Sequence, residues 1–294
     1  MEKEKNDPVF VYGTLMRGER ANDYLRNALF AGGAALRDHA MYDLGAYPGV
    51  VPRRGETVLG ELYHVDAETL KRLDEYEGEG SLYHRVRVRV TTAGGEEADA
   101  LAYRFAHPVD GKPIVRTRWN MRDDDPVWYA AYGSNLSAER FEYYVRGGLC
   151  PFNGRRCAGC RDKTPWKRSL VRTVPGAMYF ANKSSAWENK GVAFYAPERA
   201  GETIMRFYQI TFGQLKDIQR QEGGWYGRTA FVGFAEGVPA FTLTAERIQE
   251  ENAPGERYLD LIFDALTKDC RIHWETVNPY LELCRSPLAA RAGK

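Results

Sequence analysis

Apolar and charged positions alternate most regularly in the first half of the chain. From Arg85 to Val90 arginine and valine alternate, which predicts a half-buried strand with its valines inward and its arginines outward. Residues 98–105 predict another strand. Two further strand-like runs, 9–15 and 127–136, are apolar and aromatic, and each contains a Tyr-Gly step.

A helix is predicted between these strands. Asp66 is a suitable N-cap, and Leu70, Leu73 and Glu77 follow at spacings that place them on one helical face. A carboxylate therefore ends an apolar stripe that must face a core or a cleft. The second half repeats this stripe with Leu215, Ile218 and Glu222.

The tail predicts a helix that has no counterpart in the first half. Gly255 precedes it, and we interpret it as a packing helix of the second half. Strands outnumber helices and do not alternate regularly with them, so the predicted class is α+β, with small barrels and helices packed outside. The apolar face of the tail helix consists of Tyr258, Leu261, Ile262, Ala265 and Leu266.

Four short motifs occur twice and in the same order. Each half opens with the Tyr-Gly run and continues with a Gly-led apolar segment, a helical stretch ending in Glu-Gly, and Tyr-x-Arg. Four matches in one order are hard to obtain by chance, so an internal repeat is predicted. The motifs span 9–15, 60–63, 70–78 and 83–85 in the first half, and 127–136, 191–195, 215–223 and 226–228 in the second.

The predicted junction lies near residue 120. Residues 107–126 hold several prolines and an acidic run, a composition that breaks helix and strand alike. We expect one domain at 1–118 and a second, diverged domain at 119–294. The second copy is longer, mainly around residues 147–190.

Composition narrows the function classes. Hydrophobic residues make up 44% and charged residues 28%, as in globular proteins, and the formal net charge is +1. No basic tract or acidic tail favours nucleic acid or a membrane surface as a partner. The charged start, residues 1–5, precedes no signal-peptide core, and no apolar run is long enough to span a bilayer, so we expect a cytoplasmic protein.

The five cysteines all lie in the second half, which does not resemble a disulfide framework. Cys157 and Cys160 have the spacing of a metal knuckle, with Cys150 nearby. A structural zinc site needs four ligands, and no second pair or suitably spaced His is close. Reduced thiols are the preferred interpretation, and no metal site is predicted.

The repeated motifs suggest a proton-transfer site. A glycine after a strand lets the backbone turn and expose N–H groups, which together can hold an anion. A buried Glu has a raised pKa and can take up and return a proton. A loop of this kind beside such a Glu suits a carbonyl that develops negative charge. The structural alternatives are a plain turn glycine and a Glu that closes a helix near its C-cap.

Together these motifs resemble the γ-glutamylcyclotransferase and γ-glutamylaminecyclotransferase superfamily, which includes AIG2-like proteins. Residues 8–105 are similar to an almost unbroken member, including the loop at 45–49. The Tyr-Gly-Ser-Asn-Leu run at 132–136 is similar to the glutathione-related branch. The resemblance implies two tandem domains of this fold.

The resemblance also implies a reaction without cofactor or metal. The α-amine of a small-molecule γ-glutamyl substrate attacks its own γ-carbonyl and releases 5-oxoproline and a free amine. Glu77, and in the second copy Glu222, are the implied acid/base residues, and Arg85 is expected to pair structurally. The implied substrate-binding residues are Tyr12, Gly13, Thr14, Leu15 and Tyr83, and, in the second copy, Tyr132, Gly133, Ser134, Asn135 and Leu136.

Several alternatives stay open at this stage. The same pocket could bind a small ligand without turnover, or the second copy could act only as a scaffold for the first. The second copy has Gln219 where the first has Asp74, and its Glu-to-Tyr segment is shorter, so its pocket mouth is expected to differ. The identity of the amine and the oligomeric state do not follow from the residues.

Overall fold

The computed structural model describes residues 6–291, which fold as two compact units. The first unit ends at Met121 and also includes Gly233–Val238, and the second consists of Arg122–Val232 and the residues from Pro239 onward. Residues 1–5, on which the cytoplasmic expectation partly rests, lie outside the described residues. No helix within the described range has both the length and the apolarity to cross a membrane.

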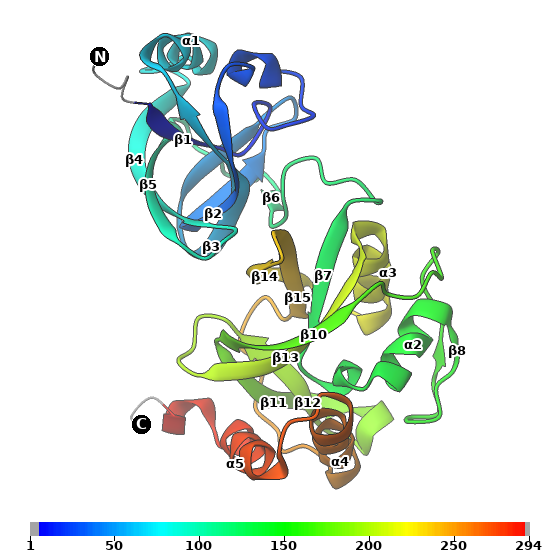
Figure 1. The fold of residues 1–294 in the computed structure, drawn as a ribbon. Coiled ribbons are helices and arrows are strands. Elements are labelled where there is room, and N and C mark those ends of the chain that lie inside the picture. Colours follow the sequence, from blue (N-terminus) through cyan, green and yellow to red (C-terminus); the bar gives the residue numbers. More distant parts are fainter. Residues whose placement is uncertain (1–5, 292–294) are drawn as a thin grey trace. The chain divides into compact units, whose positions relative to one another are not determined.

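Five strands of the first unit close into a mixed barrel (Figure 1). Hydrogen bonding follows the order β3-β1-β5-β4-β2, and β2 pairs with β3 to close the ring. Only β1 and β5 run parallel, with Val9 opposite Leu101. The helix α1 and a short 3-10 turn, η1, accompany the barrel. The bounds are β1 Asp7–Val11, η1 Asn22–Leu25, β2 Leu29–Asp43, β3 Pro48–Val65, α1 Ala67–Glu77, β4 Tyr83–Thr92, β5 Glu97–Phe105 and β6 Ile114–Val115.

The local predictions for this unit are confirmed. The side chain of Asp66 caps α1 by accepting from the Thr69 N–H at 2.7 Å, and Leu73 is fully buried. Along β4 the arginines are exposed, whereas Val90 is buried. The stretch expected to break both helix and strand does form a two-residue strand, β6, which pairs with the C-terminal end of β2.

The second unit repeats the strand order with different lengths. Its sheet runs β10-β13-β7-β15-β14, with β7 and β15 parallel at its centre, and α3 follows β13 as α1 follows β3. Among the described residues β10 and β14 stand at the two edges of this sheet, with no pairing between them that would close a barrel. The predicted second barrel therefore stays a prediction. The sheet strands and helix are β7 Pro126–Ala131, β10 Ser169–Pro175, β13 Glu202–Thr211, α3 Phe212–Glu222, β14 Arg228–Ala235 and β15 Val238–Thr244.

This unit also contains a hairpin, β11–β12, and short elements around a helix, α2. The predicted match of 191–195 with 60–63 is wrong, because 191–195 lies in β12, whereas Arg206 of β13 pairs with the end of β7 as Glu61 pairs with the end of β1. These are η2 Ser134–Leu136, α2 Ala138–Arg146, β8 Gly148–Leu149, β9 Arg156–Cys157, β11 Ala177–Ser184, η3 Ser185–Trp187 and β12 Lys190–Ala196.

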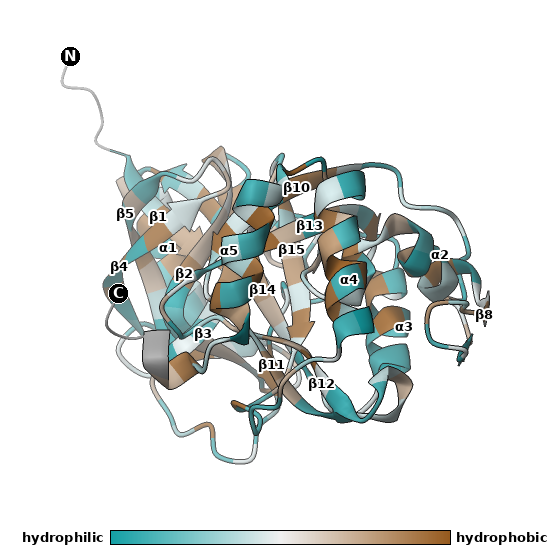
Figure 2. Ribbon diagram, turned by 90° about the horizontal axis from the view of Figure 1, so that it is seen from below, coloured by the Kyte–Doolittle hydropathy of each residue, from teal (hydrophilic) through white to brown (hydrophobic). Residues whose placement is uncertain are grey.

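The tail contains two helices where the sequence predicted one. The expected helix α4, Glu256–Asp264, begins after Gly255 and continues into a π-turn, η4, Ala265–Asp269. The second helix, α5, Trp274–Arg285, packs on β11 and buries Val277 and Leu281, and a short turn, η5, Leu288–Arg291, follows it. Polar and apolar stretches alternate along α4 and α5 (Figure 2). Pro279 inside α5 obscures its helical pattern in the sequence.

The predicted α+β class is confirmed, and the mixed barrel is confirmed for the first unit.

Close strand packing makes the glycine at position 60 a steric requirement of the first unit. A Cβ at Gly60 would lie 2.2 Å from the backbone oxygen of Val11 and 2.7 Å from the Phe10 ring. We expect Gly60→Ala to lower the free energy of unfolding by about 1–3 kcal/mol, because β1 and β3 must separate. Urea denaturation of the full chain measures this. Gly94→Ala is the control, since only the Thr92 hydroxyl lies near its added methyl, at 3.6 Å. Equal midpoints for the two variants would contradict the steric explanation.

Candidate active site

The loop after β1 carries free backbone donors. The Met16 N–H donates to the Gly13 carbonyl at 3.0 Å, which closes a turn. A Cβ on Gly13 would lie 2.6 Å from the Pro48 ring, so only glycine fits there. Within the described chain, the N–H groups of Gly13, Thr14 and Leu15 donate to no protein acceptor. They are therefore available to a ligand.

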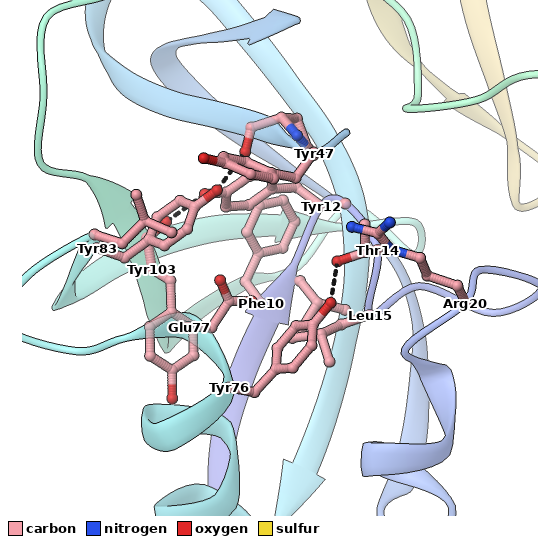
Figure 3. A pocket seen from close by; sticks show the side chains of 14 residues that line it. Phe10, Tyr12, Thr14, Leu15, Arg20, Tyr47, Tyr76, Glu77, Tyr83 and Tyr103 are labelled. Atoms are coloured by element: carbon pink, nitrogen blue, oxygen red, sulfur yellow. Dashed lines mark hydrogen bonds between the residues drawn. The ribbon is translucent and has the colours of Figure 1, made fainter. Parts of the chain in front are cut away.

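Glu77 is the last residue of α1, beside this loop. Gly78 adopts a left-handed conformation, with φ 63°, and ends the helix there. The Glu77 carboxyl lies among the aromatic side chains of the cavity (Figure 3). Burial raises the pKa of Glu77 to about 7. Among residues 6–291 no hydrogen bond or ion pair engages this carboxyl, so its proton can exchange with a ligand.

Tyrosines form the walls of the cavity and are held by hydrogen bonds. Tyr83 donates to the Pro48 carbonyl at 2.7 Å, and Tyr12 donates to the carbonyl of Tyr103. The hydroxyls of Thr14 and Tyr76 lie 3.0 Å apart. Burial raises the pKa values of Tyr12 and Tyr83 well above the usual tyrosine range, so both hydroxyls stay neutral.

The structure brings together all the site residues predicted for the first unit. They line a cavity of about 240 Å³. Other lining residues were not predicted from the sequence, among them Arg20, whose guanidinium donates to the Ala46 carbonyl at 3.0 Å. No motif marks Arg20 in the sequence. The lining residues are Phe10, Val11, Tyr12, Gly13, Thr14, Leu15, Arg20, Tyr47, Pro48, Tyr76, Glu77, Leu82, Tyr83 and Tyr103.

Arg85 has the structural role that was expected. Its guanidinium pairs with Asp74 at 2.5 Å, and the Tyr103 hydroxyl donates to the same carboxylate at 2.8 Å. This pair links α1 to β4 and β5, and Arg85 is not among the residues that line the cavity.

The second unit repeats the hydrogen bonds that hold the first site. Tyr132 donates to the Leu243 carbonyl at 2.8 Å, as Tyr12 does to Tyr103. Tyr226 donates to the Ala193 carbonyl at 2.8 Å, as Tyr83 does to Pro48. Glu222 is the last residue of α3. The loop that follows β7 and the Glu at the end of α3 therefore lie together, as the loop after β1 and Glu77 do in the first unit.

The surroundings of Glu222 differ from those of Glu77. Asn135 donates to one carboxylate oxygen at 2.9 Å, and Tyr144 donates to the other at 3.2 Å. Burial raises the pKa of Glu222, while the positive charge of Arg140 and these two hydrogen bonds act in the opposite direction. Glu222 is thus engaged by protein groups, whereas Glu77 is not. The acid/base role of Glu222 stays a prediction.

Tyr258 of α4 narrows the second site. Its hydroxyl accepts from the Ala193 N–H at 3.3 Å, and the Ser134 amide lies within hydrogen-bonding reach of the same oxygen. Only about 40 Å³ remains around the predicted residues Tyr132, Gly133, Ser134 and Asn135. Leu136, also predicted to bind substrate, is not among the lining residues; its side chain is fully buried. The sequence analysis treated the helix of Tyr258 only as packing.

The cysteines expected to be reduced thiols are free in the structure. Cys150 and Cys160 are buried, and burial raises the pKa values of Cys157 and Cys160. Across residues 6–291 no group of three or more His, Cys, Asp and Glu side chains is arranged to hold a metal ion.

Comparisons with known proteins address the first unit most directly. The family model described as "Gamma-glutamyl cyclotransferase, AIG2-like" matches residues 9–121. "Gamma-glutamylcyclotransferase family protein YtfP" of Escherichia coli (strain K12) is 35% identical over 116 residues, which cover 39% of this chain and 97% of that protein.

Two further matches reach beyond the first unit. "Histone deacetylase 5" of Arabidopsis thaliana is 27% identical over 199 residues, which cover 53% of this chain, and the match spans only 30% of that relative's length. The crystal structure of YkqA from Bacillus subtilis aligns with 96% of this chain and 100% of that one, at 20% identity and a TM-score of 0.41. The family model matches the first unit, and the similarity to YtfP extends over nearly the whole of that protein. This chain therefore belongs to the gamma-glutamyl cyclotransferase, AIG2-like family.

Proposed function

We propose that the first unit converts a γ-glutamyl amide into 5-oxoproline and a free amine, with Glu77 as acid/base. The observation that carries this proposal is a Glu carboxyl without a protein partner, whose pKa burial raises to about 7, beside three free backbone N–H donors. Family membership supports the same reaction class. The amine that leaves is not specified by these residues.

The proposed steps use only groups of this cavity. Glu77 accepts a proton from the substrate's α-ammonium, and the freed amine forms a bond with the γ-carbonyl carbon. The carbonyl oxygen becomes an oxyanion, which the N–H groups of Thr14 and Leu15 stabilise. Glu77 then donates its proton to the leaving nitrogen as the old C–N bond breaks. The ionised Glu77 takes up the second proton of the new ring nitrogen, which gives the neutral lactam, and passes this proton to the released amine. The ring of five atoms closes within one molecule, so positioning by the tyrosine walls supplies much of the rate.

Arg20 is the proposed anchor for the substrate's α-carboxylate. Its exposed side chain lies at the cavity beside Thr14 (Figure 3), and no other Arg or Lys lines this cavity in the described chain. A guanidinium can hold a carboxylate through two parallel hydrogen bonds. This contact would leave the amine and the γ-carbonyl to face Glu77 and the loop.

We propose that the second unit is a diverged copy of the first, with the boundary near residue 120. The common strand order and the two repeated tyrosine hydrogen bonds support this proposal. The engaged Glu222 and the intrusion of Tyr258 favour the first unit as the place of turnover.

Replacing Glu77 tests the proposal directly. Glu77→Gln keeps the size of the side chain but removes the titrating proton, so we expect 5-oxoproline release to fall at least about 100-fold. The assay uses a panel of γ-glutamyl-amino acids and γ-glutamyl-amines on the full chain. Glu75→Gln, an exposed Glu on the same helix, is the matched control.

The fold of the Glu77→Gln variant is checked separately. The folded protein holds the Glu77 proton more tightly than the unfolded chain does, so this residue's stabilising contribution declines as the pH rises through about 7. Glu77→Gln is therefore expected to be no less stable than wild type above this pH. Full activity in a folded Glu77→Gln variant would contradict the role of Glu77 and move the chemistry to Glu222.

The raised pKa of Glu77 also predicts a pH dependence. The base must be ionised, so kcat/KM should decrease about tenfold for each pH unit below about 7 and level off above it. Initial rates at low substrate concentration, measured from acid to neutral pH, give the profile. Glu75→Gln should show the same curve, and a profile that is flat down to the usual Glu pKa would argue against a buried base.

Arg20→Gln should separate binding from chemistry. Losing a charge-assisted hydrogen bond to the substrate's carboxylate is expected to raise KM about tenfold and leave kcat nearly unchanged. Steady-state kinetics with a γ-glutamyl substrate measure both constants. Arg26→Gln, another exposed arginine of the same segment, is the control. An unchanged KM for Arg20→Gln would remove this residue from substrate recognition.

A further inference from the structure

A large cleft lies in the second unit, next to the narrowed site. Its volume is about 590 Å³, compared with about 40 Å³ around the loop residues. Arg140 of α2, the segment 153–159 and Trp187 border it, and Trp225 and Tyr226 lie on another side. Glu222 lines both spaces. Motif residues such as Ser134, Glu222 and Tyr226 form part of its lining, and the rest comes from segments outside the motifs.

Arg140 is a buried cation with an unused donor. Only 4% of the residue is exposed. One of its terminal nitrogens donates to the Cys150 sulfur at 3.2 Å, and the other donates to the Tyr144 hydroxyl at 3.4 Å. The Nε atom is buried and has no hydrogen-bond partner. No carboxylate lies within 4 Å of this guanidinium among the described residues. Leaving a charge and a donor unpaired in the interior is costly.

The remaining charges of the cleft are mostly positive. The carboxylate of Asp217 is already paired with Arg161 and Arg220. Glu222 accepts from Asn135 and Tyr144 rather than from an arginine. Two further arginines of the lining, Arg155 and Arg156, are exposed and have no carboxylate partner in the described part of the chain. The cleft therefore carries an excess of positive charge that faces an open space.

Aromatic surfaces complete the site. Arg140 lies over the rings of Tyr144, at 5.3 Å, and Trp187, at 5.7 Å. Trp225 is 41% exposed at the opening, although large aromatic side chains are usually buried. A flat apolar body could rest on these rings while its anionic group reaches Arg140.

We propose that this cleft binds a small organic oxyanion with a flat apolar body, whose charged group is attracted by the guanidinium groups of Arg140 and Arg156, which both line the cleft. Binding here is independent of the reaction proposed for the first unit, because all the residues involved belong to the second unit. The Tyr258 hydroxyl already lies against the Ser134 amide of the loop and the Ala193 N–H of β12, so the ligand is held by arginines rather than by the Tyr-Gly loop.

The test uses two probes with the same ring and different anionic groups, phenyl phosphate and phenylacetate, and neutral phenylacetamide as the uncharged reference. Titration calorimetry and tryptophan fluorescence are measured on the full chain. We expect saturable binding of at least one anion, quenching of tryptophan emission, and much weaker binding of the amide. A preference between the anions identifies phosphate or carboxylate as the ligand group. Failure of both anions to bind at millimolar concentration would overturn the proposal.

Variants locate the binding. Arg140→Gln should weaken binding about tenfold or more, because a charge-assisted hydrogen bond to the oxyanion is lost. Arg140 is buried, so Arg156→Gln, an exposed substitution that should not disturb folding, provides a second test and should also weaken binding. Arg87→Gln, an exposed arginine on β4 of the first unit, is the control. Wild-type affinity in both Arg140→Gln and Arg156→Gln would overturn the proposal.

Discussion

The register between the first strand and β3 determines where the chemistry of the first unit can occur. Asp7 pairs with Val65, so β1 begins where β3 ends. The helix α1 follows at once with 11 residues, a rise of about 16 Å, and β1 has five residues, also about 16 Å. The end of the helix therefore lies level with the end of the strand, which places Glu77 beside the loop at Tyr12. The second unit repeats this register with Pro126 opposite Thr211.

A common scaffold therefore supports two different electrostatic environments. In the first unit the carboxyl ends among apolar and aromatic groups that offer it no partner, so burial governs its pKa. In the second unit Leu15 is replaced by Asn135 in the motif, and α2 adds Tyr144 and Arg140. These groups stabilise the charged form of Glu222. The same position carries a carboxyl without a protein partner in one unit and a carboxyl held by two hydrogen bonds in the other.

Added segments account for the other differences between the units. The two helices after β15 supply Tyr258, whose hydroxyl reaches amides that a ligand would otherwise contact. The insertion between β7 and β13 supplies Trp187 and the arginines of the large cleft. The two units therefore differ mainly in the segments between and after the strands of the main sheet, whereas the strand order and the helix that follows β3 or β13 are the same.

Local sequence signals determined much of this protein. The cap at Asp66, the alternation along β4, the Tyr-Gly loops and both Glu residues at helix ends follow from residue types at short spacing, because helix and strand periodicities are local properties. Family membership follows from the same motifs. Tertiary structure alone decided which side chains complete each site. Arg20 comes to its cavity from a loop, and Tyr258 and Arg140 line the cleft beside Glu222 from helices distant in the chain. Burial and hydrogen bonding depend on such long-range packing, so only the folded chain distinguishes a free Glu77 from an engaged Glu222.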